Sequence, residues 1–436
     1  MLSKEDNDIL THVGPGTPMG KLLRRYWMPA VLSTEVPSPD SPPVRVRLMC
    51  EDLVAFRDTD GKVGLFAANC PHRGASLFFG RNEESGLRCV YHGWKFDVSG
   101  ACVDMPSEPA ESNFKAKVRA LAYPTHESGG VIWTYMGPPE KMLPFRDFGT
   151  ESLPKERWRS NKVISYCNFV QALEGDIDSS HISYLHRNLA DFDIEDDGTD
   201  KPGYPSNRMS TRIRGFDRAP VLEVEDTPYG FRYAGIRTTP NGLKHIRLTV
   251  FVMPIMPMVS NLPLGAGIVM KVPIDDETCW RWNVAVHDDL PPADGFFQQR
   301  APRPAQPTRV PGIQERTQFA ENDYLLDREK QRTFSYTGIL GTGEQDMAVT
   351  ESMGRIYNRG REHLGTTDGA IIRMRRKLIQ AAKDLERGIE PPGLEPAYPY
   401  RLIRSAEKIL MPGEDWRKLA TMEDETYVKI AVATAP

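Results

Sequence analysis

The chain has 436 residues, of which 40% are hydrophobic and 26% charged, with a formal net charge of -4. This composition is typical of a globular protein and disfavours a disordered chain or a nucleic-acid-binding protein with a basic surface. The longest apolar stretch, 251–259, is interrupted by Pro254 and Pro257 and is too short to span a membrane. The first residues are acidic, unlike a secretion signal, so we expect a cytoplasmic protein without membrane segments.

Residues 44–137 contain short runs with strand-like patterns, such as VRVRLM, LVAFRD and VIWTYM, separated by DTDG, SG and GG turns. This pattern predicts a small antiparallel β domain. A Pro-rich, charged connection follows, and we place the domain boundary within it. The prediction is a first domain over 1–150, which includes the N-terminal segment, and a second domain over 151–436.

Two cysteine–histidine pairs lie inside the predicted β domain. Cys70-Pro-His72 is followed, after sixteen residues, by Cys89-Val-Tyr-His92. Two loops that each supply one thiolate and one imidazole can converge on one metal centre, and the alternating order differs from that of zinc fingers. The spacing is that of a Rieske [2Fe-2S] motif, with a zinc site or unrelated buried residues as the alternatives.

A second candidate metal site lies in the stretch FVQALEGDIDSSHISYLH, whose apolar spacing predicts a helix from Phe169 through Ile177. His181 and His186 would be about 140° apart on a regular helix, so one metal ion can bind both only if the helix bends, bulges or ends between them. Asp178, three residues before His181, is expected to hydrogen-bond to its imidazole. A three-residue facial site for non-haem iron requires one more carboxylate.

The rest of the chain predicts an α+β domain. Strand-like runs such as KHIRLTVFVM and CWRWNVAV follow the histidines, and a helix is expected over Asp368–Leu385 because Ile371, Met374 and Leu378 share one face. The Pro-rich connection 290–316 is expected to be an ordered surface excursion or a lid.

Together these motifs resemble the oxygenase components of Rieske non-haem iron aromatic ring-hydroxylating oxygenases, in particular the phthalate 4,5-dioxygenase type. The resemblance extends from GPGTPMGKLLRRYWMPA through CPHRGASLFFGRNEESGLRCVYHGWKFDVSG to GEQDMAVTESMGRIYNRGREHLGTTD. It implies an N-terminal all-β Rieske domain followed by a helix-grip catalytic domain. It also implies that Asp346 is the third ligand of a mononuclear Fe(II), with Glu344 and Glu351 as competing acids that would be solvated or capping residues.

The resemblance further implies a terminal oxygenase that cis-dihydroxylates an aromatic carboxylate, such as a phthalate or a substituted benzoate, with O2. Electrons would come from NAD(P)H through a separate flavin and [2Fe-2S] reductase. The subunits would form a homotrimer or stacked trimers, in which Asp178 links His181 to His72 or His92 of a neighbouring subunit. A monooxygenase or O-demethylase of an aromatic acid is the alternative within the family, and a pure Rieske electron carrier is the alternative outside it.

Substrate contacts are predicted from chemistry, because a buried carboxylate needs cationic or hydrogen-bonding partners. The strands of the second domain offer several cations, and about half of them should point to solvent. The candidate substrate-binding residues are Ser179, Arg208, Lys244 and Arg247.

Overall fold

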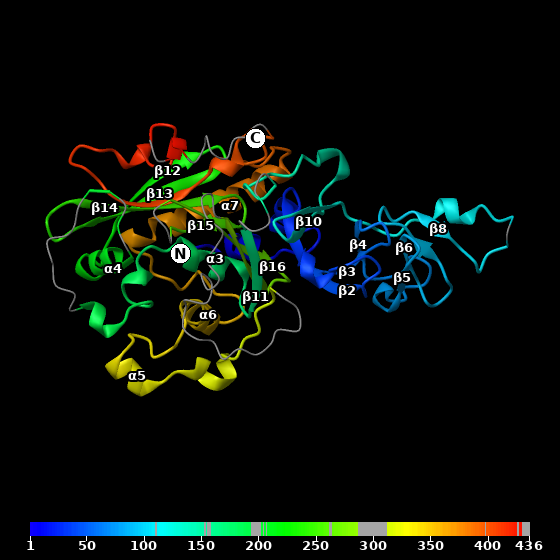
Figure 1. Cartoon of the computed structure of the whole chain (residues 1–436), viewed down its shortest axis with the longest axis horizontal. Coiled ribbons are helices and arrows are strands. Elements are labelled where there is room, and N and C mark those ends of the chain that lie inside the picture. Colours follow the sequence, from blue (N-terminus) through cyan, green and yellow to red (C-terminus); the bar gives the residue numbers. More distant parts are fainter. Residues whose placement is uncertain are drawn as a thin grey trace.

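The computed structural model describes all residues except 110, 152–153, 155–157, 193–201, 204, 206, 261–263, 287–311, 397, 425–426 and 430–436. Figure 1 shows a smaller lobe at the right, which holds β2 to β8, and a larger lobe at the left, which holds the long strands and the helices α3 to α7. This is the expected α+β order of a β-rich domain followed by a sheet with helices.

The smaller lobe is built from short antiparallel strands. One sheet has the order β2 (Val44–Leu48), β3 (Glu51–Arg57), β4 (Val63–Ala67), and the other has the order β5 (Arg81–Glu83), β6 (Gly86–Arg88), β7 (Lys95–Phe96), β8 (Cys102–Asp104). Phe56, Phe66, Leu87, Trp94 and Phe96 form a core of its own. The predicted small antiparallel β domain is therefore confirmed.

A third sheet lies where the two lobes meet. Its strand order is β1 (Trp27–Leu32), β10 (Val131–Tyr135), β9 (Thr125–Ser128), and all pairs are antiparallel. The first strand precedes the cysteine–histidine motifs in sequence and the other two follow them. This pairing brings the two ends of the β domain together beside the larger lobe.

The larger lobe contains one eight-stranded antiparallel sheet. Its order is β11 (Trp158–Ser165), β17 (Cys279–Val286), β16 (Leu264–Pro273), β18 (Ser405–Ile409), β14 (Lys244–Val252), β13 (Gly230–Thr238), β12 (Val221–Thr227), and β15 (Met256–Met258) pairs with β14. The runs predicted as strands from residue 221 to residue 286 correspond to these elements. Strand β18 comes from the far end of the chain, and it joins the two halves of the sheet.

The described α-helices pack around this sheet. They are α1 (Lys4–Thr11), α2 (Pro18–Leu23), α3 (Phe169–Ile177), α4 (Asn207–Phe216), α5 (Arg328–Thr333), α6 (Thr342–Ser352) and α7 (Gly369–Glu386). The predicted late helix is confirmed, since α7 buries Ile371, Met374 and Leu378. Helices α1 and α2 lie against α7, so the N-terminal segment packs on the larger lobe.

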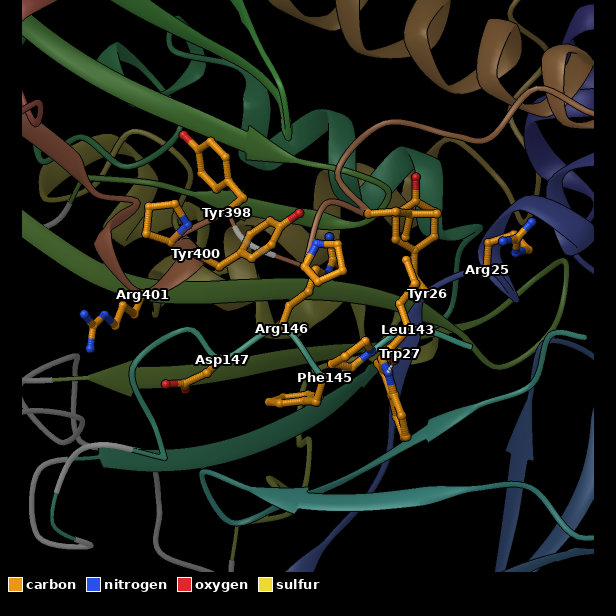
Figure 2. Close-up of a pocket in the computed structure, with 14 residues that line it drawn as sticks. Arg25, Tyr26, Trp27, Leu143, Phe145, Arg146, Asp147, Tyr398, Tyr400 and Arg401 are labelled. Carbon is orange, nitrogen blue, oxygen red and sulfur yellow. Dashed lines mark hydrogen bonds between the residues drawn. The ribbon is translucent and has the colours of Figure 1, made fainter. Parts of the chain in front are cut away.

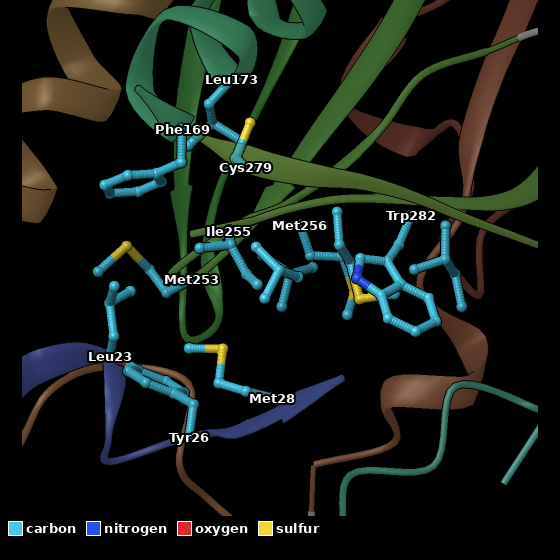
Figure 3. Packing of buried hydrophobic residues seen from close by; sticks show 14 of the residues in the cluster. Leu23, Tyr26, Met28, Phe169, Leu173, Met253, Ile255, Met256, Cys279 and Trp282 are labelled. Carbon is cyan, nitrogen blue, oxygen red and sulfur yellow. The ribbon is translucent and has the colours of Figure 1, made fainter. Parts of the chain in front are cut away.

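The main hydrophobic core continues from the N-terminal segment into the larger lobe. Figure 3 shows Tyr26 and Met28 packed below Met253, with Phe169 of α3 above them. Burying side chains of this size contributes about 1.5–3 kcal/mol each. This core therefore holds α3, the helix that leads into the candidate iron ligands, against the sheet.

The structure does not test two of the sequence predictions. Most of the Pro-rich connection 290–316 lies outside the described residues, and the domain boundary near residue 150 stays a prediction. Among the described helices, none is both long and apolar enough to cross a membrane.

Candidate active site

The two cysteine–histidine motifs form two loops with the same backbone design. The N–H of Cys70 donates to the carbonyl of Ala75, and the N–H of Cys89 donates to that of Trp94, both at 2.8 Å. Each loop closes on a glycine with positive φ, Gly74 at +74° and Gly93 at +78°. This backbone conformation strains residues that carry a Cβ, which explains why a glycine follows each of the two motifs.

The side chains of these loops suit an iron–sulfur cluster. The centroids of the His72 and His92 rings are 4.5 Å apart, and His72 stacks on Trp94 at 4.2 Å. Both thiols are buried, and burial together with the nearby Cys89 thiol raises the pKa of Cys70 to about 11. His92 Nδ1 is buried and has no hydrogen-bond partner among the described residues. Two buried sulfurs and two paired rings are the donor set that a [2Fe-2S] Rieske cluster requires.

The second group of ligands forms where α3 ends. The helix stops at Ile177, Asp178 is its extended C-cap, and His181 begins a short 3-10 turn that ends at Ser183. The sequence predicted an irregularity between the two histidines; the α-helix instead ends before both of them, and the 3-10 turn that starts at His181 ends before His186. The chain can therefore turn the two rings toward each other, and their Nε2 atoms are 3.1 Å apart.

Asp346 of α6 completes this group. Its Oδ1 lies 3.1 Å from His186 Nε2 and 3.8 Å from His181 Nε2. Two ligand atoms at right angles around a metal, each about 2.1 Å from it, are about 3.0 Å apart. Burial alone would raise the pKa of Asp346, but the His186 and His181 rings lower it below the usual value. The carboxylate is therefore available as an anionic ligand, and the spacing fits one mononuclear iron.

Gln345, which the sequence analysis did not single out, orients one of the rings. Its Nε2 donates to the carbonyl of Ile339 at 2.8 Å and to Thr337 Oγ1 at 3.1 Å. Its Oε1 must then be the acceptor that lies 2.8 Å from His186 Nδ1. The proton of His186 is thereby held on Nδ1, and the lone pair of Nε2 points to the metal site.

Asp178 lies beside the other ring. Its Oδ2 is 3.5 Å from His181 Nδ1, and its Oδ1 accepts from the N–H of Ser180 at 2.6 Å. Burial by itself would raise the pKa of Asp178, but His181 and these backbone N–H groups lower it overall. The expected proximity is present, although its geometric reason was wrong: a turn after the helix brings the two residues together, rather than a shared helical face.

Comparisons with known proteins cover both sets of ligands. A family described as "Rieske [2Fe-2S] domain" matches residues 26–122, and one described as "LigXa C-terminal domain like" matches residues 134–435. The phthalate 4,5-dioxygenase oxygenase subunit of Pseudomonas putida is 39% identical over 96% of this chain and 94% of its own. The chain belongs to the Rieske aromatic ring-hydroxylating oxygenases.

Other relatives of this oxygenase carry different names. The 3-chlorobenzoate-3,4-dioxygenase oxygenase subunit of Comamonas testosteroni is 36% identical over 98% of this chain and all of its own. The 5,5'-dehydrodivanillate O-demethylase oxygenase subunit of Sphingobium sp. is 33% identical over 90% of this chain and 83% of its own. The crystal structure of dicamba monooxygenase bound to dicamba shares the fold, with a TM-score of 0.56, 19% identity, and coverage of 84% of this chain and 99% of that one.

Glu351, one of the two competing acids, has another role than expected. Glu351 is not a solvated residue: its buried carboxylate pairs with Arg316 at 2.8 Å and accepts from Tyr324 Oη at 3.0 Å. Glu174 is also buried, and it pairs with Arg359 and Arg375. Glu351 and Glu174 therefore both form structural ion pairs. Asp346, which is on the same helix as Glu351, faces the histidines instead.

The four candidate substrate-binding residues lie in different surroundings. Ser179 is buried, and its Oγ has no partner among the described residues. Arg247 is 4% exposed and pairs with Gly235 of β13, where an added Cβ would lie 2.9 Å from Ser179 Oγ. Lys244 is exposed, and its offset of three residues from Arg247 sends it to the other face of the sheet. Arg208 is exposed on α4.

The sheet face beside Ser179 is rich in positive charge. Arg237, two residues after Gly235, donates to the Ser179 carbonyl at 2.6 Å. Burial and the neighbouring Arg247 lower the pKa of Arg237 to about 10. Burial alone would raise the pKa of Glu407, but His245, Arg214 and Arg247 lower it to about 2. Arg237 was not among the candidates, because strand alternation alone does not say which face meets the iron site.

Proposed function

We propose that this oxygenase is the terminal component of a multicomponent dioxygenase that cis-dihydroxylates an aromatic carboxylate. The main support for a carboxylate substrate is the buried, electropositive sheet face of Arg247 and Arg237, next to Ser179 and the iron ligands. A cation in such surroundings favours an anionic ligand, and Arg binds carboxylates in a bidentate manner. The relatives named after phthalate and chlorobenzoate support the same substrate class.

In this reaction the residues of the chain would bind and orient the substrate and the metal ligands. When bound, the cluster supplies single electrons and the mononuclear iron supplies the chemistry with dioxygen. Arg247 and Ser179 would hold the substrate carboxylate, which orients the ring toward the ligand triad. Gln345 and Asp178 would hold the two imidazoles in their ligating orientation.

We propose that electrons reach the triad between subunits of a homotrimer or of stacked trimers, with a separate NAD(P)H-dependent flavin and [2Fe-2S] reductase as their source. Figure 1 supports this, because the cluster loops lie in the projecting small lobe and the triad lies in the large lobe. Tyr91, next to His92, is 55% exposed, which offers a contact surface at the cluster. Asp178 would then join His181 to a cluster histidine of the neighbouring subunit.

The direct test is product analysis with isotopically labelled dioxygen. The holoenzyme, supplied with a surrogate reductase and NADH, is offered phthalate, isophthalate and substituted benzoates, and oxygen uptake is measured against product. Two labelled atoms in a cis-dihydrodiol are expected. No product with any of these acids, while the cluster is reduced and reoxidised normally, would contradict the substrate class.

The second candidate function is a monooxygenase or O-demethylase of an aromatic acid. It is supported by the relative named as an O-demethylase, at 33% identity. The same experiment separates the two reactions, since a monooxygenase leaves one labelled atom in the product and the other in water. Methoxybenzoates belong in the substrate panel for this reason.

A further inference from the structure

A cavity of about 240 Å³ lies at the junction of the two lobes, away from the residues of both metal sites. We call it the seam pocket. It is lined by residues 25–27, 143–147 and 398–401, together with Leu394 and Pro396, and Figure 2 shows Arg146 between Tyr26 and Tyr400. A dry cavity of about 150 Å³ is large enough for benzene. The seam pocket therefore has room for one aromatic ring with a small substituent.

Arg146 supplies the pocket with a cation. Its Nη1 donates to the carbonyls of Met253 at 3.2 Å and Gly393 at 3.0 Å, and no ion pair joins it to a carboxylate of the described residues. The neighbouring Asp147 is used elsewhere, because its Oδ1 accepts from the N–H groups of Gly149 and Thr150. Arg146 is half-buried, and this partial loss of solvent lowers the pKa of its guanidinium. An anionic group in the pocket would relieve this cost.

The pocket also has aromatic walls and a free hydroxyl. The Arg146 guanidinium carbon lies 5.1 Å from the ring centroid of Tyr26 and 5.3 Å from that of Tyr400. Tyr400 is 3% exposed, and its Oη is buried without a hydrogen-bond partner among the described residues. A buried hydroxyl of this kind normally has a partner, so the pocket presents a donor as well as a cation. Aromatic faces around a planar guanidinium favour a flat ligand.

We propose that the seam pocket binds a monocyclic aromatic carboxylate of the benzoate class, at a site separate from the iron triad. The carboxylate pairs with Arg146 and accepts from Tyr400 Oη, and the ring lies against the aromatic side chains. Bound there, the ligand contacts the connection 143–147 and the segments 25–27 and 398–401, and so holds them together. In Figure 3, Met253 lies between Tyr26 and Phe169, so the core separates this pocket from the helix that leads to the iron ligands.

The test is isothermal titration of the holoenzyme with benzoate, without reductase so that no turnover occurs. We expect Arg146→Gln to lose one equivalent of bound benzoate per chain, and Tyr400→Phe to weaken that equivalent at least tenfold. Benzamide, which has the same shape without the charge, should bind this site at least tenfold more weakly than benzoate. Arg361→Gln removes the same charge from an exposed position and should change nothing.

Two results would overturn the proposal. One is an unchanged benzoate stoichiometry and affinity in Arg146→Gln and Tyr400→Phe. The other is loss of the same equivalent in His181→Ala, which would place the ligand at the iron triad instead. If Arg146→Gln does not fold, Tyr400→Phe alone decides, because this change removes the hydroxyl and keeps the aromatic ring.

Discussion

At the scale of single residues, the site depends on hydrogen bonds that set the direction of ligand atoms. His181 and His186 present their Nε2 atoms to Asp346; His186 Nδ1 is hydrogen-bonded to Gln345, whereas His181 Nδ1 lies 3.5 Å from Asp178 without a hydrogen bond. Such partners typically change metal affinity by about 10–100-fold when they are removed. Gln345 is the partner that the structure adds to the sequence prediction.

Replacement of Gln345 by Leu should therefore weaken mononuclear iron binding by about 10–100-fold. The reason is that the His186 proton loses the acceptor that holds it on Nδ1. Chelator competition followed by iron analysis measures the effect, and the cluster absorption spectrum should not change. Gln345→Glu keeps the acceptor and should restore much of the affinity, while Gln380→Leu on the exposed side of α7 serves as the control. Equal iron retention in Gln345→Leu and the control would refute the role.

Replacement of Arg247 by Gln should raise KM for the aromatic acid by at least tenfold, or about 1.4 kcal/mol, because a buried carboxylate partner is lost. Arg208→Gln and Lys244→Gln test the other two cations in the same assay. Since both of these residues are exposed, we expect smaller effects from them. The iron contents of all three variants should match the wild type, and the variant with the largest KM change identifies the carboxylate contact.

At the scale of elements, buried ion pairs and loop conformations keep the ligand-bearing segments in place. Glu174 on α3 accepts from Arg359 at 2.8 Å and from Arg375 of α7 at 2.6 Å. These pairs tie the helix that leads to the iron ligands to the late helix and to the segment after α6. In the small lobe, the two glycines with positive φ close the cluster loops.

Glu174→Gln should lower the free energy of unfolding by about 3–5 kcal/mol, because it leaves the buried guanidinium of Arg359 without a counter-charge and leaves Arg375 with Glu362 alone. Thermal or denaturant unfolding of the apoprotein measures this. Asp226→Asn removes the partner of Arg373 in an exposed pair, so its effect should be about 0–1 kcal/mol. A similar small loss of unfolding free energy in both variants would show that the buried ion pairs do not stabilise the fold by the proposed amount.

Gly93→Ala should reduce cluster occupancy more than Gly74→Ala. Both changes put a Cβ on backbone with positive φ, which costs about 1 kcal/mol. Only at Gly93 would the new Cβ also meet another residue, the Pro106 ring at 2.7 Å. The visible absorption of the cluster per mole of chain gives the comparison. Equal occupancy in the two variants would mean that the contact with Pro106 does not matter.

At the scale of the whole molecule, the two metal sites belong to different lobes with different cores. The cluster loops surround the small core of Phe66 and Phe96, whereas the triad is held by α3, α6 and the eight-stranded sheet. The metals should therefore load and be lost independently within one chain. A pure electron carrier would have no use for the second site.

His181→Ala should reduce the iron content from about three to about two per chain while the cluster spectrum remains. Oxygen uptake coupled to product should disappear in the same variant. Cys89→Ala gives the reciprocal measurement, since it should remove the cluster irons and leave the triad able to bind one. A wild-type protein with only the two cluster irons would exclude the oxygenase mechanism.

The sequence by itself determined the parts of this protein that depend on local spacing and alternation. These are the two cysteine–histidine loops at 70–72 and 89–92, the small β domain, the helix from Phe169 to Ile177, and the faces of α7. Tertiary structure decided everything that joins distant segments: that Asp346 rather than Glu351 meets the histidines, that Gln345 lies against His186, and that Arg247 is on the sheet face next to Ser179 while Lys244 is on the other. The physical reason is that the sequence shows which side chains share a face of a strand or helix, but not what that face packs against. Packing between elements far apart in the chain makes that choice.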